Sequence, residues 1–557
     1  MKDVHPKSSQ SKEKATVSGQ SRRSFMKKSA GMAAAVGLIG PSKTLADGSK
    51  PVENTSGVKI AMSPLRQKTF AIVSSPGSGQ KWISDDWNPR SPFVIWGKPL
   101  RVQPVLMYAT PQPREQTSWR SWGGVLSEET AQEEVERISG ELESLSKTAE
   151  FPVEILPVQK VKSPEEAAQA IKSDNDVVVV YPASGSGRTL RASVPPEGNA
   201  IIFVRHRSGP VYYWYEALSV QYLDTGEEEP RGGNPPGLGK THVEDVVVDD
   251  YDEVLWRLRA LYGVKNFIGA KIIALGGPMG KYAGDAPQIA RDKYKLDIIE
   301  IPYSDIEKRI TSAFADKARI SKAEQWTETY LSLPNTTLKT DRPFVVNAFL
   351  LYDIFKDYMR ENQTAAFTIR DCMSTIIPMS KTTACLSLGL LNDEGLLAFC
   401  ESDFVIIPAG ILLRHISGTP VFLHNSTFPH KAVVTCAHCS APRRMDGDNY
   451  EPTTILTHEE SDYGAAPKVD IPIGQEVTFI DPEYTVGRWV GIRGNVVDNP
   501  FLPICRSQQD VQIQGNWKKL LSEARDSHWM MTYGNYLQEV GYAARKLGIV
   551  WENISDV

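Results

Sequence analysis

Residues 391–442 read LNDEGLLAFCESDFVIIPAGILLRHISGTPVFLHNSTFPHKAVVTCAHCSAP, and the pattern of apolar and turn-forming residues along the chain changes within them. Ahead of them, apolar strand-like runs alternate with helical patterns, which predicts parallel sheets with right-handed crossovers. After Gly418, short apolar runs are separated by Pro, Gly and Asp turns, which predicts a barrel or a sandwich. We therefore expect an α/β protein with two Rossmann-like, parallel-sheet domains, followed by a β-rich C-terminal domain with terminal helices.

The main elements of the α/β part follow from local patterns. The charged segment 128–148 carries apolar residues at helical spacing and predicts a surface helix. The run DVVVVY at 176–181 is typical of a strand buried on both faces. A strand is expected at 271–275, a helix at 342–361 and a loop at 371–380. In the β-rich part, strands are expected at 419–423, 432–436, 453–456, 476–480 and 486–492.

Length and composition indicate a globular protein with several domains. The 557 residues exceed the ~250–300 at which single hydrophobic cores stop growing, so several domains are expected. The content of 41% hydrophobic and 23% charged residues is that of a globular protein. A formal net charge of -5 favours neither nucleic acid nor an anionic membrane as partner. Six cysteines are too few for a disulfide scaffold, so we expect local roles for them.

The N-terminus has the features of an export signal. Arg22 and Arg23 form a twin-arginine pattern, a short apolar run follows at 29–40, and Ala46 ends a small-residue cleavage site. The apolar run is too short to span a membrane, which needs about 20 apolar residues. We expect residues 1–46 to direct the folded protein to the periplasm through the twin-arginine pathway.

The expected domain boundaries lie in polar, Pro- and Gly-rich segments. The clearest is 224–241, where Gly239-Lys240-Thr241 looks like the end of a phosphate-binding loop. Asn234 stands where that motif needs its first glycine, and no strand leads into it, so a plain loop is expected. The expected division is a linker at 47–66, an α/β domain at 67–240, a second at 241–415 and the β-rich domain at 416–557.

The chemistry-bearing residues gather around the opening stretch. Glu401 and Asp403 stand two residues apart at the mouth of an apolar segment, where two buried carboxylates need a cation or another partner. Asn425 ends an expected strand, and His438 follows 13 positions later. Oxygen and imidazole ligands with open positions suit Mn²⁺ or Mg²⁺, and Zn²⁺ less well. His415 is interpreted as a packing or surface residue, as is His430.

Two further features leave alternatives open. Cys436-x-x-Cys439 is half of a zinc motif, but the sequence has no second such pair. The Ala-Pro turn after it disfavours a redox-active pair. The remaining interpretation is that these cysteines pack in the interior. Ser184 and Arg188 lie in or beside a Gly/Ser loop after the strand at 176–181, where open α/β sheets bind ligands. They either contact a substrate oxygen or form a structural turn.

Four segments carry a family resemblance. LNDEGLLAFCESD at 391–403, SGTPVFLHN at 417–425, VVTCAHCSAP at 433–442 and THEESDYGAAPKVDIPIGQEVTFI at 457–480 resemble the L-fucose/L-arabinose isomerase family. The resemblance is strongest to its fucose isomerase-like "sugar isomerase" branch. It extends over roughly residues 170–550 and is specific between about 385 and 480.

The resemblance implies a metal-dependent aldose–ketose isomerase that moves a proton between C1 and C2 of a sugar through a cis-enediol. The implied cofactor is a divalent metal, usually Mn²⁺. Glu401 matches the glutamate that binds the metal and acts as a base, and Asn425 stands in place of a second acidic ligand. His438 is the candidate for the histidine ligand, and His458 begins a segment that resembles a substrate-contacting one. The family's active site is built at a subunit junction, which implies a homo-oligomer.

Asn425 is a departure from the family pattern. An amide removes a negative charge from the metal site and one half of an acid–base pair. Asp403 or Asp393 is a candidate to take over that catalytic role. Two other functions therefore stay open: a non-catalytic periplasmic sugar-binding protein, and a metal-dependent lyase or epimerase acting on a sugar derivative.

Overall fold

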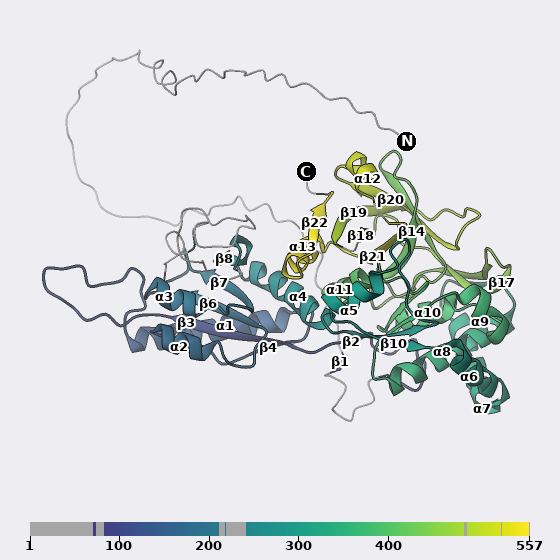
Figure 1. The fold of residues 1–557 in the computed structure, drawn as a ribbon, viewed down its shortest axis with the longest axis horizontal. Helices are drawn as coiled ribbons and strands as arrows, with labels where there is room; N and C mark the ends of the chain where they lie inside the picture. The colour runs from purple at the N-terminus through teal and green to yellow at the C-terminus, as the bar shows by residue number, and fades with distance from the viewer. Residues whose placement is uncertain are drawn as a thin grey trace, which may run out of the picture. The chain divides into compact units, whose positions relative to one another are not determined.

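The computed structural model describes residues 71–73, 83–210, 218, 241–483, 487–524 and 526–555. The expected signal and linker (1–66) and most of the boundary segment 224–241 lie outside these residues. The predicted order of architectures is confirmed at a coarse level, since parallel sheets with helices are followed by a β-rich part (Figure 1). No helix in these ranges is long and apolar enough to cross a membrane.

The first parallel sheet has the strand order β4-β3-β6-β7-β8, with β5 beside β3. Every residue of β6 is buried, as the apolar run predicted. Helix α1 occupies the predicted surface-helix segment, opens with a capping box between Ser127 and Thr130, and buries an apolar stripe. The bounds are β3 Leu100–Met107, α1 Glu128–Thr148, β4 Val153–Ile155, β5 Gln159–Val161, α2 Pro164–Ala170, β6 Val177–Pro182, α3 Gly187–Ala192, β7 Asn199–Val204, η1 Val243–Asp245 and β8 Val246–Val248.

The second parallel sheet has the order β10-β9-β12-β13. The predicted strand at 271–275 and helix at 342–361 are confirmed as β9 and α8. The strands are β9 Lys271–Leu275, β10 Asp297–Ile301, β12 Ala366–Ile369 and β13 Leu397–Phe399. The helices are α4 Tyr251–Phe267, α5 Ala286–Lys293, α6 Tyr303–Ala315, α7 Lys317–Leu331, α8 Arg342–Glu361, α9 Cys372–Ser380, α10 Cys385–Asp393 and α11 Ile407–Ser417.

The predicted loop at 371–380 is wrong, because α9 fills most of it. Cys372, Ile376 and Ser380 are buried at a spacing of four, so they form the buried stripe of a short helix that packs against α6 and α8. Pro378 lies inside this helix near its end, where the missing backbone N–H removes a single hydrogen bond. Tertiary packing outweighs the low helix propensity of the segment.

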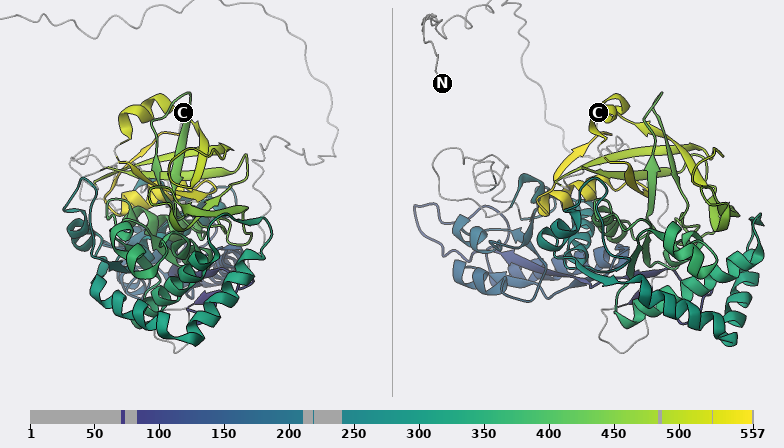
Figure 2. Two further views of the ribbon diagram at one scale, coloured as in Figure 1. Left: turned by 90° about the vertical axis from the view of Figure 1, so that its right-hand side faces the viewer. Right: turned by 45° about the vertical axis from the view of Figure 1, so that its right-hand side comes forward.

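The β-rich part closes into a six-stranded barrel in the order β18-β21-β14-β15-β20-β19, since β19 pairs again with β18. Figure 2 shows the strands of this part in green and yellow. The predicted strand at 419–423 is displaced to β14, which begins after Pro420. The bounds are β14 Phe422–Ser426, β15 Val433–His438, β18 Glu476–Pro482, β19 Arg488–Asp498, β20 Ser507–Gln514, α12 Trp517–Glu523, β21 His528–Tyr533, α13 Leu537–Lys546 and β22 Val550–Asn553.

Two smaller pairings complete the described structure. Strand β11 (Thr336–Leu338) pairs in parallel with β16 (Thr453–His458), which pairs with β17 (Tyr463–Val469), so this sheet joins the second α/β region to the β-rich part. Strand β1 (Ala71–Val73) pairs in parallel with β2 (Val94–Trp96).

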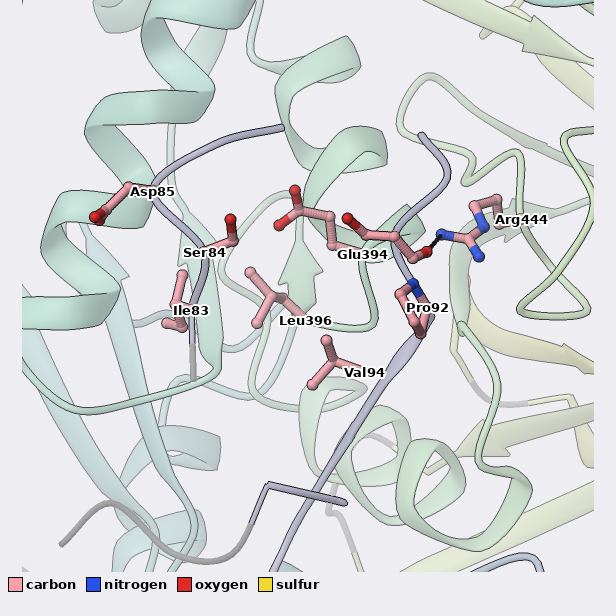
Figure 3. A pocket seen from close by; sticks show the side chains of 9 residues that line it. Ile83, Ser84, Asp85, Pro92, Val94, Glu394, Leu396 and Arg444 are labelled. Atoms are coloured by element: carbon pink, nitrogen blue, oxygen red, sulfur yellow. Dashed lines mark hydrogen bonds between the residues drawn. The ribbon is translucent and has the colours of Figure 1, made fainter. Parts of the chain in front are cut away.

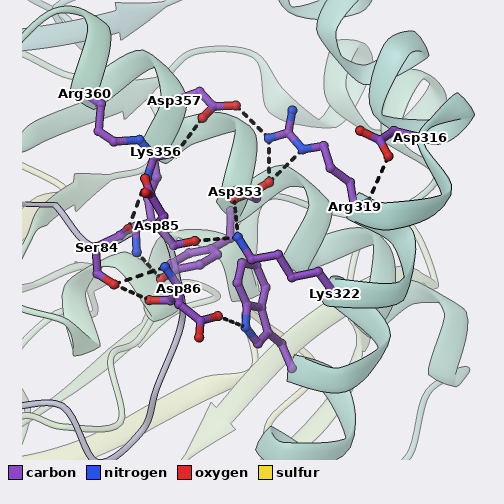
Figure 4. Close-up of polar contacts among 12 residues, drawn as sticks. Ser84, Asp85, Asp86, Asp316, Arg319, Lys322, Asp353, Lys356, Asp357 and Arg360 are labelled. Carbon is purple, nitrogen blue, oxygen red and sulfur yellow. Dashed lines mark hydrogen bonds and ion pairs between the residues drawn. The ribbon is translucent and has the colours of Figure 1, made fainter.

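The segment just before β2 is anchored on the second α/β region. Trp87 is buried against Phe349 of α8, with ring centroids 5.1 Å apart. A cavity of about 350 Å³ lies beside this segment, lined by Glu394 and Arg444 among others (Figure 3). Asp86 accepts a hydrogen bond from Trp326 of α7 at 2.7 Å, within a network that reaches along α7 and α8 (Figure 4).

Candidate metal centre

Three neighbouring parallel strands end at one side of a cavity. The loops after β9, β12 and β13 contribute Lys281, Asp371 and Glu401 to its lining. The carboxyl ends of parallel strands lie along the same edge of a sheet, where open α/β sheets bind their ligands. The cavity has a volume of about 520 Å³, and the strands β14, β15 and β16 line it with Asn425, His438 and His458.

The loop that carries Glu401 has an unusual backbone. Glu401 and Ser402 have φ values of 64° and 52°, a left-handed conformation that non-glycine residues rarely adopt. The loop after β9 holds it in place. The Ser402 hydroxyl donates to the carbonyl of Gly277 at 3.0 Å, and the N–H of Met279 donates to the carbonyl of Ser402 at 3.0 Å. Backbone conformations of this kind persist where the surroundings enforce them, and they cluster at functional sites.

Two histidines from the barrel meet the Glu401 carboxylate. His438 ends β15, and its Nε2 lies 3.5 Å from Glu401 Oε1. His528 begins β21, and its Nε2 lies 3.2 Å from Glu401 Oε2. One ligand atom from each of the three residues lies within 4.8 Å of the others. The Glu401 side chain is 39% exposed, whereas both imidazoles are buried, so the carboxylate faces the cavity.

Asp403 orients His528 from behind. Its Oδ2 accepts a hydrogen bond from His528 Nδ1 at 2.7 Å, while its Oδ1 accepts from the backbone N–H groups of Lys281 at 2.9 Å and Val405 at 3.1 Å. A ring that donates from Nδ1 presents its Nε2 to Glu401, the arrangement that a metal-binding histidine needs. Asp403 is completely buried, so it cannot touch a substrate; the structure gives it a positioning role.

The charges in this group reinforce one another. Burial lowers the pKa of His528, but its hydrogen bonds with Asp403 and Glu401 outweigh burial and raise the pKa to about 9. Burial raises the pKa of Glu401, and hydrogen bonds from His438 and His528 outweigh it and hold the pKa well below its usual range. The Lys281 ammonium lies 3.6 Å from Glu401 and 3.3 Å from His528 Nε2. The Lys281 ammonium and the charged His528 ring therefore balance the negative charge of Glu401 and Asp403.

The structure brings four of the predicted site residues to one cavity: Glu401, Asn425, His438 and His458. Asn425 presents its amide there, while its neighbour His424 is enclosed in the barrel beside Phe479 and Trp529. Burial lowers the pKa of His424 to about 3, so that ring is neutral. Alternation along β14 thus separates a residue that faces the cavity from one that packs in the barrel.

Ser184 and Arg188 lie elsewhere. The Ser184 hydroxyl is buried after β6, where it donates to the carbonyl of Val125 at 2.8 Å and accepts from the N–H of Ala109 at 2.9 Å. Arg188 lies on α3 with an exposed side chain. Neither is among the residues that line the cavity in the described part of the chain. The contacts of Ser184 are those of the structural turn, one of the two interpretations left open by the sequence.

The remaining histidines of the opening stretch and the two cysteines of the Cys436-x-x-Cys439 pair lie in different environments. His415 packs on α11 against Trp96, with ring centroids 4.6 Å apart, and His430 is exposed between β14 and β15. Cys436 is buried in the barrel core, whereas Cys439 lies beside Cys385 at the cavity wall. The six cysteines, all within the described ranges, are free thiols.

Sequence reasoning missed Lys281 and His528. Lys281 carries a detectable signal, because it follows the Gly276-Gly277-Pro278 loop after a predicted strand, at the ligand-binding edge. His528 carries none: it opens an apolar strand far along the chain, without a motif around it.

When the sequence is compared with known protein families and with curated proteins, no match is found.

Proposed function

We propose that this protein is a metal-dependent enzyme that interconverts an aldose and a ketose, the activity implied by its resemblance to fucose isomerase-like proteins. The observation that carries the proposal is the convergence of Glu401, His438 and His528 within 4.8 Å beside a cavity. One carboxylate and two imidazoles form a donor set that fits a divalent first-row cation. We propose Mn²⁺, with Mg²⁺ or Zn²⁺ as alternatives.

The cavity supports a small, hydroxyl-rich substrate. Its volume of about 520 Å³ is in the range of small-molecule sites. Asn425, Ser440, His458 and Glu460 contribute hydrogen-bonding side chains to its lining. Polar groups of this kind recognise hydroxyls by donating and accepting hydrogen bonds.

Each residue has a role in the proposed reaction. A divalent cation held there would polarise the substrate carbonyl and stabilise negative charge on its oxygen. Glu401 takes the proton from C2 and returns it to C1, so the base ends unchanged. The hydroxyl proton on C2 passes to the oxygen on C1, with the Lys281 ammonium as the hydrogen-bond donor beside it. Asp403 holds the His528 ring throughout.

The test combines metal content with proton exchange. Wild-type protein is expected to hold about one Mn²⁺ per chain at the Glu401 site, and Glu401→Gln is expected to lose it. Asp371→Asn is the matched control, because Asp371 lines the same cavity outside the donor group and asparagine accepts its left-handed backbone. Incubation with aldoses in deuterated water should place deuterium at C1 or C2. A metal-loaded protein without exchange on a broad panel of aldoses would contradict the isomerase proposal.

A second candidate function is sugar binding without catalysis. Asn425 favours it, because the amide cannot act as the second acid–base group, and the fully buried Asp403 cannot replace it from behind His528. In that case sugars bind with the same affinity to wild type and to Glu401→Gln, and no deuterium enters the sugar. Exchange without a shift of the carbonyl group would instead indicate an epimerase or a lyase.

A further inference from the structure

A second group of ligand-type side chains lies in the wall of the same cavity. Cys385 begins α10, Cys439 directly follows β15, and His458 ends β16. One ligand atom from each lies within 4.8 Å of the other two, and all three residues are buried. The group shares no residue with Glu401, His438 and His528.

Cys505 lies beside this group, next to Cys439, although it is not one of the three residues whose ligand atoms lie within 4.8 Å of one another. It lies just before β20, packs against Cys385 and Cys439, and shares a thiol hydrogen bond with Cys439. The next residue, Arg506, donates from Nε to the carbonyl of Thr457 at 2.7 Å and pairs with Glu459. These contacts hold the Cys505 loop against the end of β16, on both sides of His458.

The hydrogen bonding of His458 is incomplete. The residue is only 6% exposed, and its Nδ1 is buried without a hydrogen-bond partner among the described residues. A buried polar atom without a partner is destabilising, so the unpaired imidazole nitrogen of His458 needs an explanation. Thiols are weak donors and acceptors, whereas thiolates and imidazole are strong ligands for soft cations.

We propose that Cys385, Cys439, Cys505 and His458 bind one zinc ion in a closed tetrahedral site with three sulfur ligands and one nitrogen ligand. Three thiolates and one imidazole match structural zinc, whereas Mn²⁺ prefers oxygen-rich sites. Binding releases the thiol protons to solvent, and no oxidant or reductant takes part.

The site has a structural consequence for the first centre. It ties α10, β15, β16 and the loop before β20 together at one point. Because His438 and Cys439 are consecutive, their side chains leave the chain in different directions: His438 meets Glu401 and Cys439 meets the thiols. A zinc ion on Cys439 therefore fixes the end of β15 and, with it, the position of His438.

The proposal is tested by metal counting and cobalt spectroscopy on the full chain, purified under reducing conditions. Wild type is expected to retain about one zinc per chain after dialysis in excess Mn²⁺. Co²⁺ in its place should give the near-ultraviolet absorption of thiolate–cobalt bonds. Cys385→Ser/Cys439→Ser should lose both signals, whereas Cys372→Ser, a control thiol in the same cavity wall, should keep them. Glu401→Gln should keep them too, which separates this proposal from the proposed function.

A measurement on wild type alone guards against a variant that does not fold. Zinc should protect three of the six thiols from a thiol reagent and raise the unfolding temperature. The proposal is overturned if folded, reduced wild type binds no zinc, if the double variant keeps the thiolate–cobalt band, or if zinc protects no thiol. A disulfide between Cys439 and either neighbour in freshly isolated protein would overturn it as well.

Discussion

Asp403→Asn separates the positioning of His528 from the donor group itself. The Oδ1 of asparagine can still accept the backbone N–H groups of Lys281 and Val405, so the loop keeps its anchors. Its amide nitrogen, however, faces His528 Nδ1 and donates where Asp403 accepts. The ring must then accept at Nδ1 and carry its proton on Nε2. In wild type a metal ion can displace the Nε2 proton shared with Glu401, because Nδ1 keeps its own proton for Asp403; in the variant, Nε2 holds the ring's only proton and has no lone pair for a cation.

The size of the effect follows from this geometry. Loss of the partner that orients a metal-bound histidine typically reduces affinity by about 10–100-fold. We expect that loss for Mn²⁺, which corresponds to about 1.4–2.7 kcal/mol. The fold should survive, because both backbone hydrogen bonds of the loop remain.

The assay is titration calorimetry with Mn²⁺, with circular dichroism to confirm folding. Asp526→Asn is the matched control. Asp526 accepts from the backbone N–H of His528 at 3.3 Å and makes no bond to its ring. The Asp526→Asn variant lacks a buried carboxylate next to the site but keeps the tautomer of the His528 ring, so its Mn²⁺ affinity should stay within about threefold of wild type. Equal affinities for Asp403→Asn and wild type would refute the role of Asp403 and the His528 ligand assignment.

Other predictions concern stability. Lys356→Met removes the buried cation that lies 2.9 Å from the Glu394 carboxylate and leaves Tyr352 as its hydrogen-bond donor, which should cost about 3–5 kcal/mol in urea unfolding. The double variant with Glu394→Gln should recover most of this stability, and equal losses in the two variants would contradict the prediction. Burial and Arg414 lower the pKa of His415 to about 3 from an unfolded 6.5, so its stability contribution is present above pH 6.5 and lost as pH falls towards 3. Between pH 7 and pH 5, wild type should lose about 2 kcal/mol more than His415→Phe, and identical pH profiles would refute it. Both Gly464 and Gly474 have a positive φ, +77° and +88°, but a Cβ added at Gly464 would lie 2.5 Å from a backbone atom, whereas one added at Gly474 would meet open space. Gly464→Ala should therefore lower the midpoint of denaturant unfolding more than Gly474→Ala does.

The fold was predictable where the pattern is local. The buried run of β6 and the long amphipathic α8 carry their period within a few residues, so both were placed correctly. Helix α9 was not, because its helicity depends on burial of Cys372 and Ile376 in a core that also contains residues of the distant strands β9 and β12. Propensity alone favoured a loop there.

The site was predictable only in part for the same reason. Glu401 and His438 lie close enough in sequence for one motif to hold both. His528 lies 125 residues after Asp403 and meets it only through barrel closure. The Cys436-x-x-Cys439 spacing suggested a pair, but the barrel core takes one thiol and the cavity wall takes the other. Neighbours in sequence were separated, and distant residues were joined.

The position of β21 late in the sequence determines when the barrel can close during synthesis of the chain. This strand pairs with both β18 and β14, so the barrel has a gap until residues 528–533 have been synthesised. Glu401, Asp403 and His438 leave the ribosome well before that point, but His528, which completes their group, is still missing. The group of Glu401, His438 and His528 is therefore incomplete during most of translation. If the group binds a metal ion as proposed, uptake of the ion is a late step, and a chain truncated before β21 lacks the donor His528.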